Sequence, residues 1–233
     1  MTTIASNLQA VRESIAASAD AAGRKADEIV LLAVSKTFSS EAIREAFAAG
    51  QRRFAESYVQ EALHKIEALK DLGIEWHFIG PIQGNKTRLI AQSFAWAHSV
   101  DRLKIAERLS DQRPVSMQPL QVCLQVNISG EVSKSGVAPN EVLEIAKAIA
   151  KLPGLALRGL MAVPAPNVDV AAQRAGFAEL RRIYEMLKGE GLGLDTLSMG
   201  MSDDYPAAIA EGATIVRIGS AIFGRRNYLE RKA

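Results

Sequence analysis

The sequence has a single cysteine, Cys123, among its 233 residues. One thiol cannot form an intramolecular disulfide, and this agrees with a protein that works in a reducing compartment. Cys123 lies inside an apolar run, so we expect a buried and inert thiol rather than a nucleophile.

Long hydrophobic segments are absent as well. No apolar run approaches the length needed to span a bilayer. The first residues do not form a signal peptide, because Arg12, Glu13 and Asp20 interrupt any apolar core there. The net charge is only +2, and the lysines and arginines are spread among acids rather than gathered in a nucleic-acid-binding stripe. These absences predict a soluble, cytoplasmic protein that contacts neither membranes nor nucleic acids.

Low-complexity segments and interdomain linkers are also absent. The length suits one large domain, and apolar residues make up 48% of the chain, which is enough for a sizeable core. We therefore treat residues 1–233 as a single domain. No G-x-G-x-x-G motif follows the first strand, which weakens the case for an open, dinucleotide-binding sheet.

What the chain does have is a regular alternation of strands and helices. A helix with Ile4, Leu8, Val11 and Ile15 at helical spacing comes first and ends near Gly23. Eight short apolar segments then follow as predicted strands: 29–35, 52–56, 75–79, 95–100, 120–127, 155–163, 196–199 and 214–218. Predicted helices separate them, capped by residues such as Ser39 or Ser40 and Asp101. Eight βα units in this length predict an α/β fold, a closed (β/α)8 TIM barrel with an additional N-terminal helix.

The first strand ends on a lysine, in the segment Val30-Leu31-Leu32-Ala33-Val34-Ser35-Lys36. Strand alternation places Lys36 on the same face as Leu32 and Val34. Burial would favour the neutral amine, the form that attacks a carbonyl to make a Schiff base. The segment alone also fits a solvated lysine just after a strand, so other residues must decide.

Further polar residues fall at the ends of the predicted strands. In a (β/α)8 barrel the C-terminal ends of the strands form one face, and sites are built there. The residues expected on this face are Lys36, Glu56, Ser57, His77, Asn127, Ser198, Gly200, Arg217, Gly219 and Ser220. We expect them to line one opening.

The last two strands add the two clearest signals. The loops Ser198-Met199-Gly200-Met201-Ser202 and Gly219-Ser220-Ala221 occupy the usual phosphate site of this barrel, and their small residues let backbone N–H groups approach an anion. Arg217 shares a face with Ile215 and Gly219, and an arginine there would only donate to an aromatic nitrogen and keep it unprotonated. A Schiff-base lysine, a phosphate cradle and this arginine together indicate pyridoxal 5'-phosphate (PLP), held as a weak electron sink.

The motifs of the chain resemble those of the pyridoxal phosphate homeostasis proteins, single-domain relatives of the N-terminal barrel of alanine racemase. The resemblance covers nearly the whole chain, and its most specific segment is Trp76-His77-Phe78-Ile79-Gly80-Pro81-Ile82-Gln83-Gly84-Asn85-Lys86. Its other segments are 33–37, 133–136, 158–162, 197–204 and 216–224.

The resemblance implies specific roles for residues at the strand ends. Lys36 would carry PLP as a Schiff base, Ser198, Gly219 and Ser220 would contact the phosphate, and Arg217 would contact the pyridine nitrogen. We add Ser57, His77, Met199 and Gly200 as candidate cofactor-binding residues, with no metal ligand and no catalytic residue. Ala55 and Ser57 stand where the family usually has Gly and Asn, which puts one cofactor contact in question.

The resemblance also implies a role in vitamin B6 and amino-acid homeostasis without an established turnover. Racemisation needs a second acid/base group on the far side of the cofactor, which alanine racemase takes from a second domain across a dimer. The chain ends soon after Phe223, and Tyr58, Tyr184, Tyr205 and Tyr228 have no spacing that argues for this role. We therefore expect a monomeric carrier that hands PLP to apo-enzymes, with Lys134 as a candidate second amine in transfer. A PLP-dependent racemase or lyase and a cofactor-free Schiff-base aldolase are the alternatives.

Overall fold

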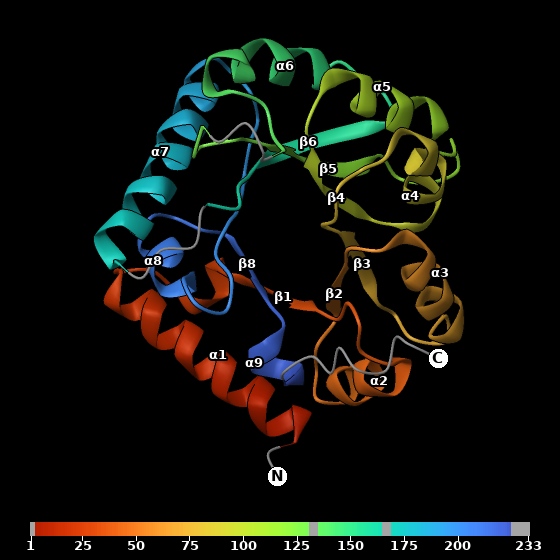
Figure 1. Ribbon diagram of the computed structural model, residues 1–233, viewed down its shortest axis with the longest axis vertical. Helices are drawn as coiled ribbons and strands as arrows, with labels where there is room; N and C mark the ends of the chain where they lie inside the picture. The colour runs from red at the N-terminus through yellow and green to blue at the C-terminus, as the bar shows by residue number, and fades with distance from the viewer. Residues whose placement is uncertain (1–2, 131–134, 165–168, 225–233) are drawn as a thin grey trace.

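A closed parallel barrel organises the computed structural model, which describes residues 3–130, 135–164 and 169–224 (Figure 1). Its eight strands pair in chain order, β1 to β8, and β8 returns to pair with β1. Helices lie outside the ring of strands, as Figure 1 shows. The (β/α)8 barrel predicted from the alternating pattern is confirmed.

Each strand lies within the range predicted for it. The strands are Val30–Val34 (β1), Arg53–Glu56 (β2), Glu75–Phe78 (β3), Trp96–Val100 (β4), Leu120–Gln125 (β5), Leu155–Met161 (β6), Thr196–Ser198 (β7) and Ile215–Ile218 (β8). They are short and mostly buried because the barrel packs them between an inner and an outer layer of side chains.

Helices follow the strands, and short 3-10 turns precede some of them. The helices are Ile4–Ala21 (α1), Ser40–Ala48 (α2), Val59–Ala68 (α3), Thr87–Ser93 (α4), Leu103–Gln112 (α5), Val142–Ile149 (α6), Val170–Gly189 (α7), Tyr205–Ala210 (α8) and Ser220–Phe223 (α9). The 3-10 turns are Ala26–Glu28 (η1), Gly84–Lys86 (η2) and Pro139–Glu141 (η3). Among these described residues no helix is both long and apolar enough to cross a membrane.

The structure tests two of the predicted helix N-caps. Ser39 caps α2, because its side chain accepts a hydrogen bond from the backbone N–H of Ala42. The expected cap at Asp101 is wrong: Arg102 occupies the cap position of α5, and the Asp101 carboxylate instead accepts hydrogen bonds from the Arg102 guanidinium. The ion pair withdraws the carboxylate from the helix N–H groups, which then have no side-chain cap.

The additional N-terminal helix, α1, packs against α2, α8 and α9, as can be followed in Figure 1. It buries Leu8, Val11 and Ile15, the residues whose spacing predicts it. Because α1 lies across the seam where the last units of the barrel meet the first, it covers the closure between β8 and β1.

The main hydrophobic core lies between the strands and the helices. Cys123 is fully buried, as predicted, and burial raises the pKa of its thiol to about 12, which disfavours the reactive thiolate. A second, small cluster of Leu32, Val34, Ala55 and Ile215 fills part of the barrel interior. Buried polar side chains, among them His77, His98, Ser198 and Arg217, share the interior, which is unusual for a layer that normally holds branched apolar residues.

Candidate functional site

The first element of the site is the turn that carries Lys36. Lys36 follows β1 at the C-terminal end of the barrel, which we call the mouth, and its side chain is half-buried. Thr37, next in the chain, has a φ of +71°, in the left-handed region that a β-branched residue rarely adopts. Its backbone N–H donates to the Glu61 carboxylate at 2.5 Å. A hydrogen bond to a carboxylate thus holds the unfavourable turn immediately after the lysine.

A buried ion cluster holds the other side of the same turn. Lys65 of α3 donates from Nζ to the Ser35 carbonyl oxygen at 2.8 Å, and to the carboxylates of Glu56 and Glu61 at 2.7 Å each. The Ser35 hydroxyl also donates to Glu56 Oε1, at 2.7 Å. We call Ser35, Glu56, Glu61 and Lys65 the lysine-turn cluster. It contacts the residues on both sides of Lys36 and so fixes the backbone that positions the amine.

Burial strengthens the electrostatic coupling between the charged groups of this cluster. The side chains of Glu56 and Lys65 are 0% and 7% exposed. Desolvation raises the pKa of Glu56, against the opposing effect of Lys65. Glu56 Oε2 has no hydrogen-bond partner among the described residues. Breaking a buried pair of this kind leaves an uncompensated charge, so the two residues depend strongly on one another.

The second element of the site is Arg217 of β8, which lies inside the barrel. Its Nη1 donates to the carbonyl and hydroxyl oxygens of Ser198, and its Nη2 donates to the Ala162 carbonyl at 2.9 Å. Burial lowers the pKa of Arg217 to about 10, which still leaves the guanidinium charged at neutral pH. Its Nε donates to none of the described residues. Arg217 is thus a cation held in a fixed position, and its Nε–H remains able to donate to a ligand.

Beneath Arg217 a line of hydrogen bonds runs down the barrel interior. Ser198 Oγ lies 2.8 Å from His98 Nδ1, and His98 Nε2 lies 2.9 Å from His77 Nδ1. His77 Nε2 lies 2.9 Å from the Glu75 carboxylate. We call this series, from Arg217 to Glu75, the axial chain. It joins the mouth to the N-terminal ends of the strands, which we call the floor.

The two ends of the axial chain fix the proton positions along it. The ionised Glu75 carboxylate can only accept, because its bond to His77 lowers its pKa, so His77 Nε2 carries the proton. Burial lowers the pKa of both histidines, so both rings are neutral, and His98 therefore donates from Nε2 to His77 Nδ1. Ser198 must then donate its hydroxyl proton to His98 Nδ1 while accepting from Arg217. Every donor in the chain points away from the mouth.

The third element consists of the loops after β7 and β8. The backbone N–H of Arg217 donates to the Gly200 carbonyl at 3.0 Å, which ties the first loop to β8. The N–H groups of Gly200, Ser220 and Ala221 donate to none of the described residues. Gly219 brings the end of β8 close to β1, because a Cβ there would lie 3.0 Å from the Val34 carbonyl oxygen. These N–H groups and the adjacent Arg217 form an environment suited to an anion.

The structure brings most of the predicted residues to one end of the barrel. Lys36, Ser57, Gly200, Arg217, Gly219 and Ser220 follow or end the strands at the mouth. The register pairs Ala33 with Ile218, and Gly219 packs closely against Val34, the last residue of β1. The turn that carries Lys36 therefore begins next to the loop after β8.

The structure places three predicted residues deeper in the barrel or its core than the others. His77 lies beneath His98 and lines a cavity at the floor, so it does not reach the mouth. The Met199 side chain is fully buried in the outer core, which leaves only its backbone to the site. The Ser198 hydroxyl is fully buried and bonded to His98 and Arg217, so its contact with a phosphate stays a prediction.

The remaining candidates are Lys134 and the four tyrosines. Lys134 and Tyr228 are outside the described residues. The hydroxyl of Tyr184 donates to the Leu194 carbonyl at 3.0 Å, and that of Tyr205 lies 2.6 Å from Ser14 Oγ, so both are engaged away from the mouth. Tyr58 is exposed at the start of α3.

Sequence reasoning missed Lys65 and His98. Lys65 resembles any solvated helix lysine, although its i, i+4 spacing from Glu61 and its place on the buried face of α3 with Ala62 were available signals. His98 lies in an apolar strand and shares a face with Trp96, so only barrel closure brings it to Ser198. The chemistry that supports Arg217 is therefore non-local in the sequence.

The fold and the site define a class: a closed (β/α)8 barrel with a lysine after its first strand and a buried arginine in its last. The chain belongs to the family described as alanine racemase, N-terminal domain, whose model matches residues 4–227, and within it to the pyridoxal phosphate homeostasis proteins. The Pseudomonas aeruginosa protein of that name is 60% identical over 228 residues, covering 98% of each chain. The Escherichia coli K12 protein of that name is 53% identical over 234 residues, covering 99% of this chain and 100% of its own.

A solved structure extends the comparison to three dimensions. PipY of Synechococcus elongatus, solved with PLP bound, is 37% identical and superposes with a TM-score of 0.84. The match covers 95% of this chain and 100% of PipY. The same barrel is therefore shared along almost the whole length of both chains.

Proposed function

We propose that this protein binds PLP at the mouth of the barrel, with Lys36 as the covalent attachment point, and serves intracellular PLP and amino-acid homeostasis. The observation that carries the proposal is the fixed Arg217 guanidinium inside a barrel whose mouth has a half-buried lysine and unpaired backbone N–H groups. The names of the relatives and the PLP bound to PipY support the same assignment.

The residues at the mouth fit the charges and size of this cofactor. The N–H groups of Gly200, Ser220 and Ala221 are suited to the phosphate, and the glycine at 219 lets the loop after β8 lie close against β1. Ser57 follows β2, next to β1, so it lies on the same side of the mouth as Lys36. When bound, PLP supplies an aldehyde for a primary amine and a pyridine ring that withdraws electrons.

Arg217 determines what the site does with that ring. It can only donate hydrogen bonds, so it would hold the pyridine nitrogen in its unprotonated form. An unprotonated pyridine is the weaker electron sink, which disfavours removal of a proton from a bound amino acid. The arginine thus favours holding the cofactor over using it, and we propose that no catalytic turnover accompanies binding.

Two of the four tyrosines agree with this view. A racemase needs a second acid/base group on the far side of the cofactor. Tyr184 and Tyr205 are bonded elsewhere, as described above. We therefore place the protein as a carrier that acts in the cytoplasm as a monomer and transfers PLP to apo-enzymes through transient contacts.

The absorption spectrum of the purified protein tests binding and attachment together. We expect a yellow protein whose visible absorption disappears on borohydride reduction, with the reduced adduct mapped by mass spectrometry to Lys36. Lys36→Ala should remove the adduct, whereas Lys25→Ala, an exposed lysine before β1, should leave it intact. An adduct of undiminished amount at the mouth of Lys36→Ala would overturn the assignment of the lysine.

A second experiment separates a carrier from an enzyme. PLP-loaded protein is mixed with an apo PLP enzyme, and recovery of that enzyme's activity is followed. In parallel, D- and L-amino acids are incubated with the loaded protein and analysed for racemisation or cleavage. Sustained turnover that depends on Lys36 would favour the racemase or lyase. A colourless protein that retains no vitamin would favour the cofactor-free aldolase.

A further inference from the structure

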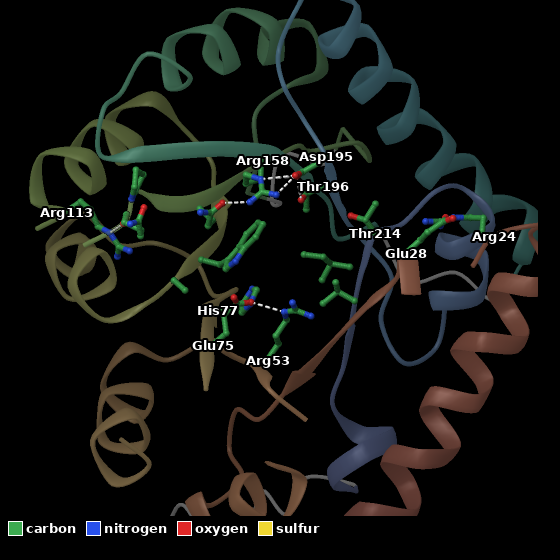
Figure 2. Close-up of a pocket in the computed structure, with 17 residues that line it drawn as sticks. Arg24, Glu28, Arg53, Glu75, His77, Arg113, Arg158, Asp195, Thr196 and Thr214 are labelled. Carbon is green, nitrogen blue, oxygen red and sulfur yellow. Dashed lines mark hydrogen bonds and ion pairs between the residues drawn. The ribbon is translucent and has the colours of Figure 1, made fainter. Parts of the chain in front are cut away.

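The floor of the barrel contains a second hollow, separate from the mouth. It has a volume of about 700 Å³ and is lined by residues at the N-terminal ends of the strands, among them Val30, Arg53, Glu75, Trp96 and Ile215 (Figure 2). Ligand pockets commonly have volumes of roughly 300–1,000 Å³, so this hollow is large enough for a small molecule. We call it the floor cavity.

Buried side chains separate the floor cavity from the mouth. His77 and His98 are 1% and 0% exposed and lie in the barrel interior between Glu75 and Ser198. Leu32 and Ala55, both fully buried, fill the adjacent part of the interior. A molecule in the floor cavity therefore contacts neither Lys36 nor the loops after β7 and β8.

The lining of the floor cavity carries an excess of positive charge. Figure 2 shows guanidinium and carboxylate groups arranged around it. The four arginines of the lining are Arg24, Arg53, Arg113 and Arg158, and the three carboxylates are Glu28, Glu75 and Asp195. His77 is neutral, so one positive charge is left over, and a single negative charge would balance it.

Most of these guanidinium groups are occupied by the protein. Arg158 directs Nε and Nη2 to Asp195 and Nη1 to Gln121. Arg24 and Arg113 each direct Nη1 to two backbone carbonyls, which makes them structural ties between segments. Their positions are determined by the fold.

Arg53 is different. Its Nε donates to Glu75 at 3.0 Å, while its Nη1 and Nη2 donate to none of the described residues. Figure 2 shows its side chain extending into the cavity beside His77. Two parallel N–H donors on one guanidinium match the two oxygens of a carboxylate. Arg53 is therefore the open oxyanion-binding group of the lining.

We propose that the floor cavity binds a small monocarboxylate, with its two oxygens on Nη1 and Nη2 of Arg53. The single surplus charge fits a monoanion better than a dianion. Val30, Ile215 and Trp96 give the cavity an apolar portion that suits a short hydrocarbon chain. The site uses none of the residues of the proposed PLP site.

Tryptophan NMR signals can report directly on this site. The chain has two tryptophans, and Trp96 lines the floor cavity whereas Trp76 does not. We expect butyrate to shift the indole N–H signal of Trp96 saturably and to leave that of Trp76 in place, at constant ionic strength held with chloride. Trp96→Phe assigns the two signals.

Substitution of Arg53 supplies the decisive comparison. Arg53→Gln should weaken butyrate binding by roughly 10- to 100-fold, the effect of losing a charge-assisted pair. Arg44→Gln is the matched control, because Arg44 forms a half-exposed ion pair with Asp71 outside the cavity, and it should bind like the unmodified protein. Arg53→Lys keeps the positive charge but lacks the two parallel N–H donors, so it should bind butyrate more weakly than the unmodified protein. This second variant keeps the test decisive if Arg53→Gln misfolds.

Three outcomes would overturn the proposal. The first is a Trp96 signal that does not shift, or shifts without saturating. The second is equal butyrate binding by Arg53→Gln and the unmodified protein. The third is inorganic phosphate binding as tightly as butyrate, which would make the floor cavity a general anion site. PLP loading at Lys36 is measured separately in each variant, so failure of the mouth assignment is distinguishable from failure of this one.

Discussion

Arg217 and Ser198 are joined twice: Nη1 of Arg217 donates to the carbonyl oxygen of Ser198 at 2.5 Å and to its hydroxyl oxygen at 2.8 Å. Both residues are almost completely buried. A buried guanidinium is stable only where its donors are satisfied, and Ser198 satisfies both protons of one nitrogen. The serine therefore fixes the arginine that we place against the cofactor.

Ser198→Ala should loosen Arg217 without removing it. The substitution leaves an Arg217 donor and His98 Nδ1 without their partner, and we expect unfolding to become easier by about 1–3 kcal/mol. Because Arg217 sets the electronic state of the ring, the PLP adduct at Lys36 should still form but absorb at a different wavelength. Urea denaturation and the absorption spectrum measure the two effects.

Ser110→Ala is the matched control for that experiment. Ser110 is also buried, but its hydroxyl accepts from the Gly154 N–H on the outer side of the barrel. This variant should lose stability and keep the absorption spectrum of the unmodified protein. A Ser198→Ala spectrum identical to that of Ser110→Ala would contradict the role assigned to Ser198.

Lys65→Met should disturb the turn that carries Lys36. The substitution leaves Glu56 buried without its cation, and breaking such a pair costs about 3–5 kcal/mol of stability. The Ser35 carbonyl also loses its donor, so we expect slower formation of the Lys36 adduct. Denaturation and the rate of PLP uptake measure these effects.

Two comparisons make the Lys65 experiment specific. Adding Glu56→Gln to Lys65→Met removes the isolated charge and should recover part of the lost stability. Lys70→Met removes an exposed pair with Glu67, which solvent screens, and should leave the free energy of unfolding nearly unchanged. Unchanged PLP uptake in a folded Lys65→Met protein would show that the cluster does not position Lys36.

Local sequence patterns predicted the barrel because each of its units is local. Apolar runs marked the strands, and serine and glycine marked helix ends such as those at Ser39 and Gly50. Strand-end position was also enough to gather Lys36, Arg217 and Gly219 at one face, since parallel strands in a barrel all end together.

The buried residues that hold Arg217 in place could not be predicted from local sequence patterns. Ser198 and His98 are 100 residues apart, and their contact depends on which face of β4 turns inward. His77 lies near a strand end in the sequence, yet its ring points toward Glu75 at the floor. Strand position gives height along the barrel, whereas the direction of a long side chain comes only from packing.

Gly80→Ala should be strongly destabilising and should reduce PLP loading. A Cβ at Gly80 would overlap the backbone carbonyl of Ser57, which cannot move without shifting the loop after β2. We expect a loss of roughly 1–3 kcal/mol, typical of overpacking. Gly73→Ala is the control, because a Cβ there meets nothing within 4 Å. Equal PLP affinity in the two variants would exclude a contribution of the Ser57 loop.

The buried histidines of the axial chain should make the protein less stable in mild acid. Burial lowers the pKa of His77 and His98 below the value of about 6.5 that they have in the unfolded chain. As pH falls below 6.5, the unfolded chain takes up protons that the folded protein excludes, so the free energy of unfolding decreases. The stabilisation is fully present above about pH 6.5, and each histidine contributes a slope of up to about 1.4 kcal/mol per pH unit below it.

Urea denaturation between about pH 7.5 and pH 5.5 measures this slope. His98→Gln should reduce it, because a neutral amide can accept from Ser198 and donate to His77 without titrating. His64→Gln is the matched control, since His64 is exposed on α3, and its slope should equal that of the unmodified protein. If His98→Gln and His64→Gln have the same slope, protons are entering the folded barrel, and the neutral axial chain that orients Ser198 toward His98 does not exist.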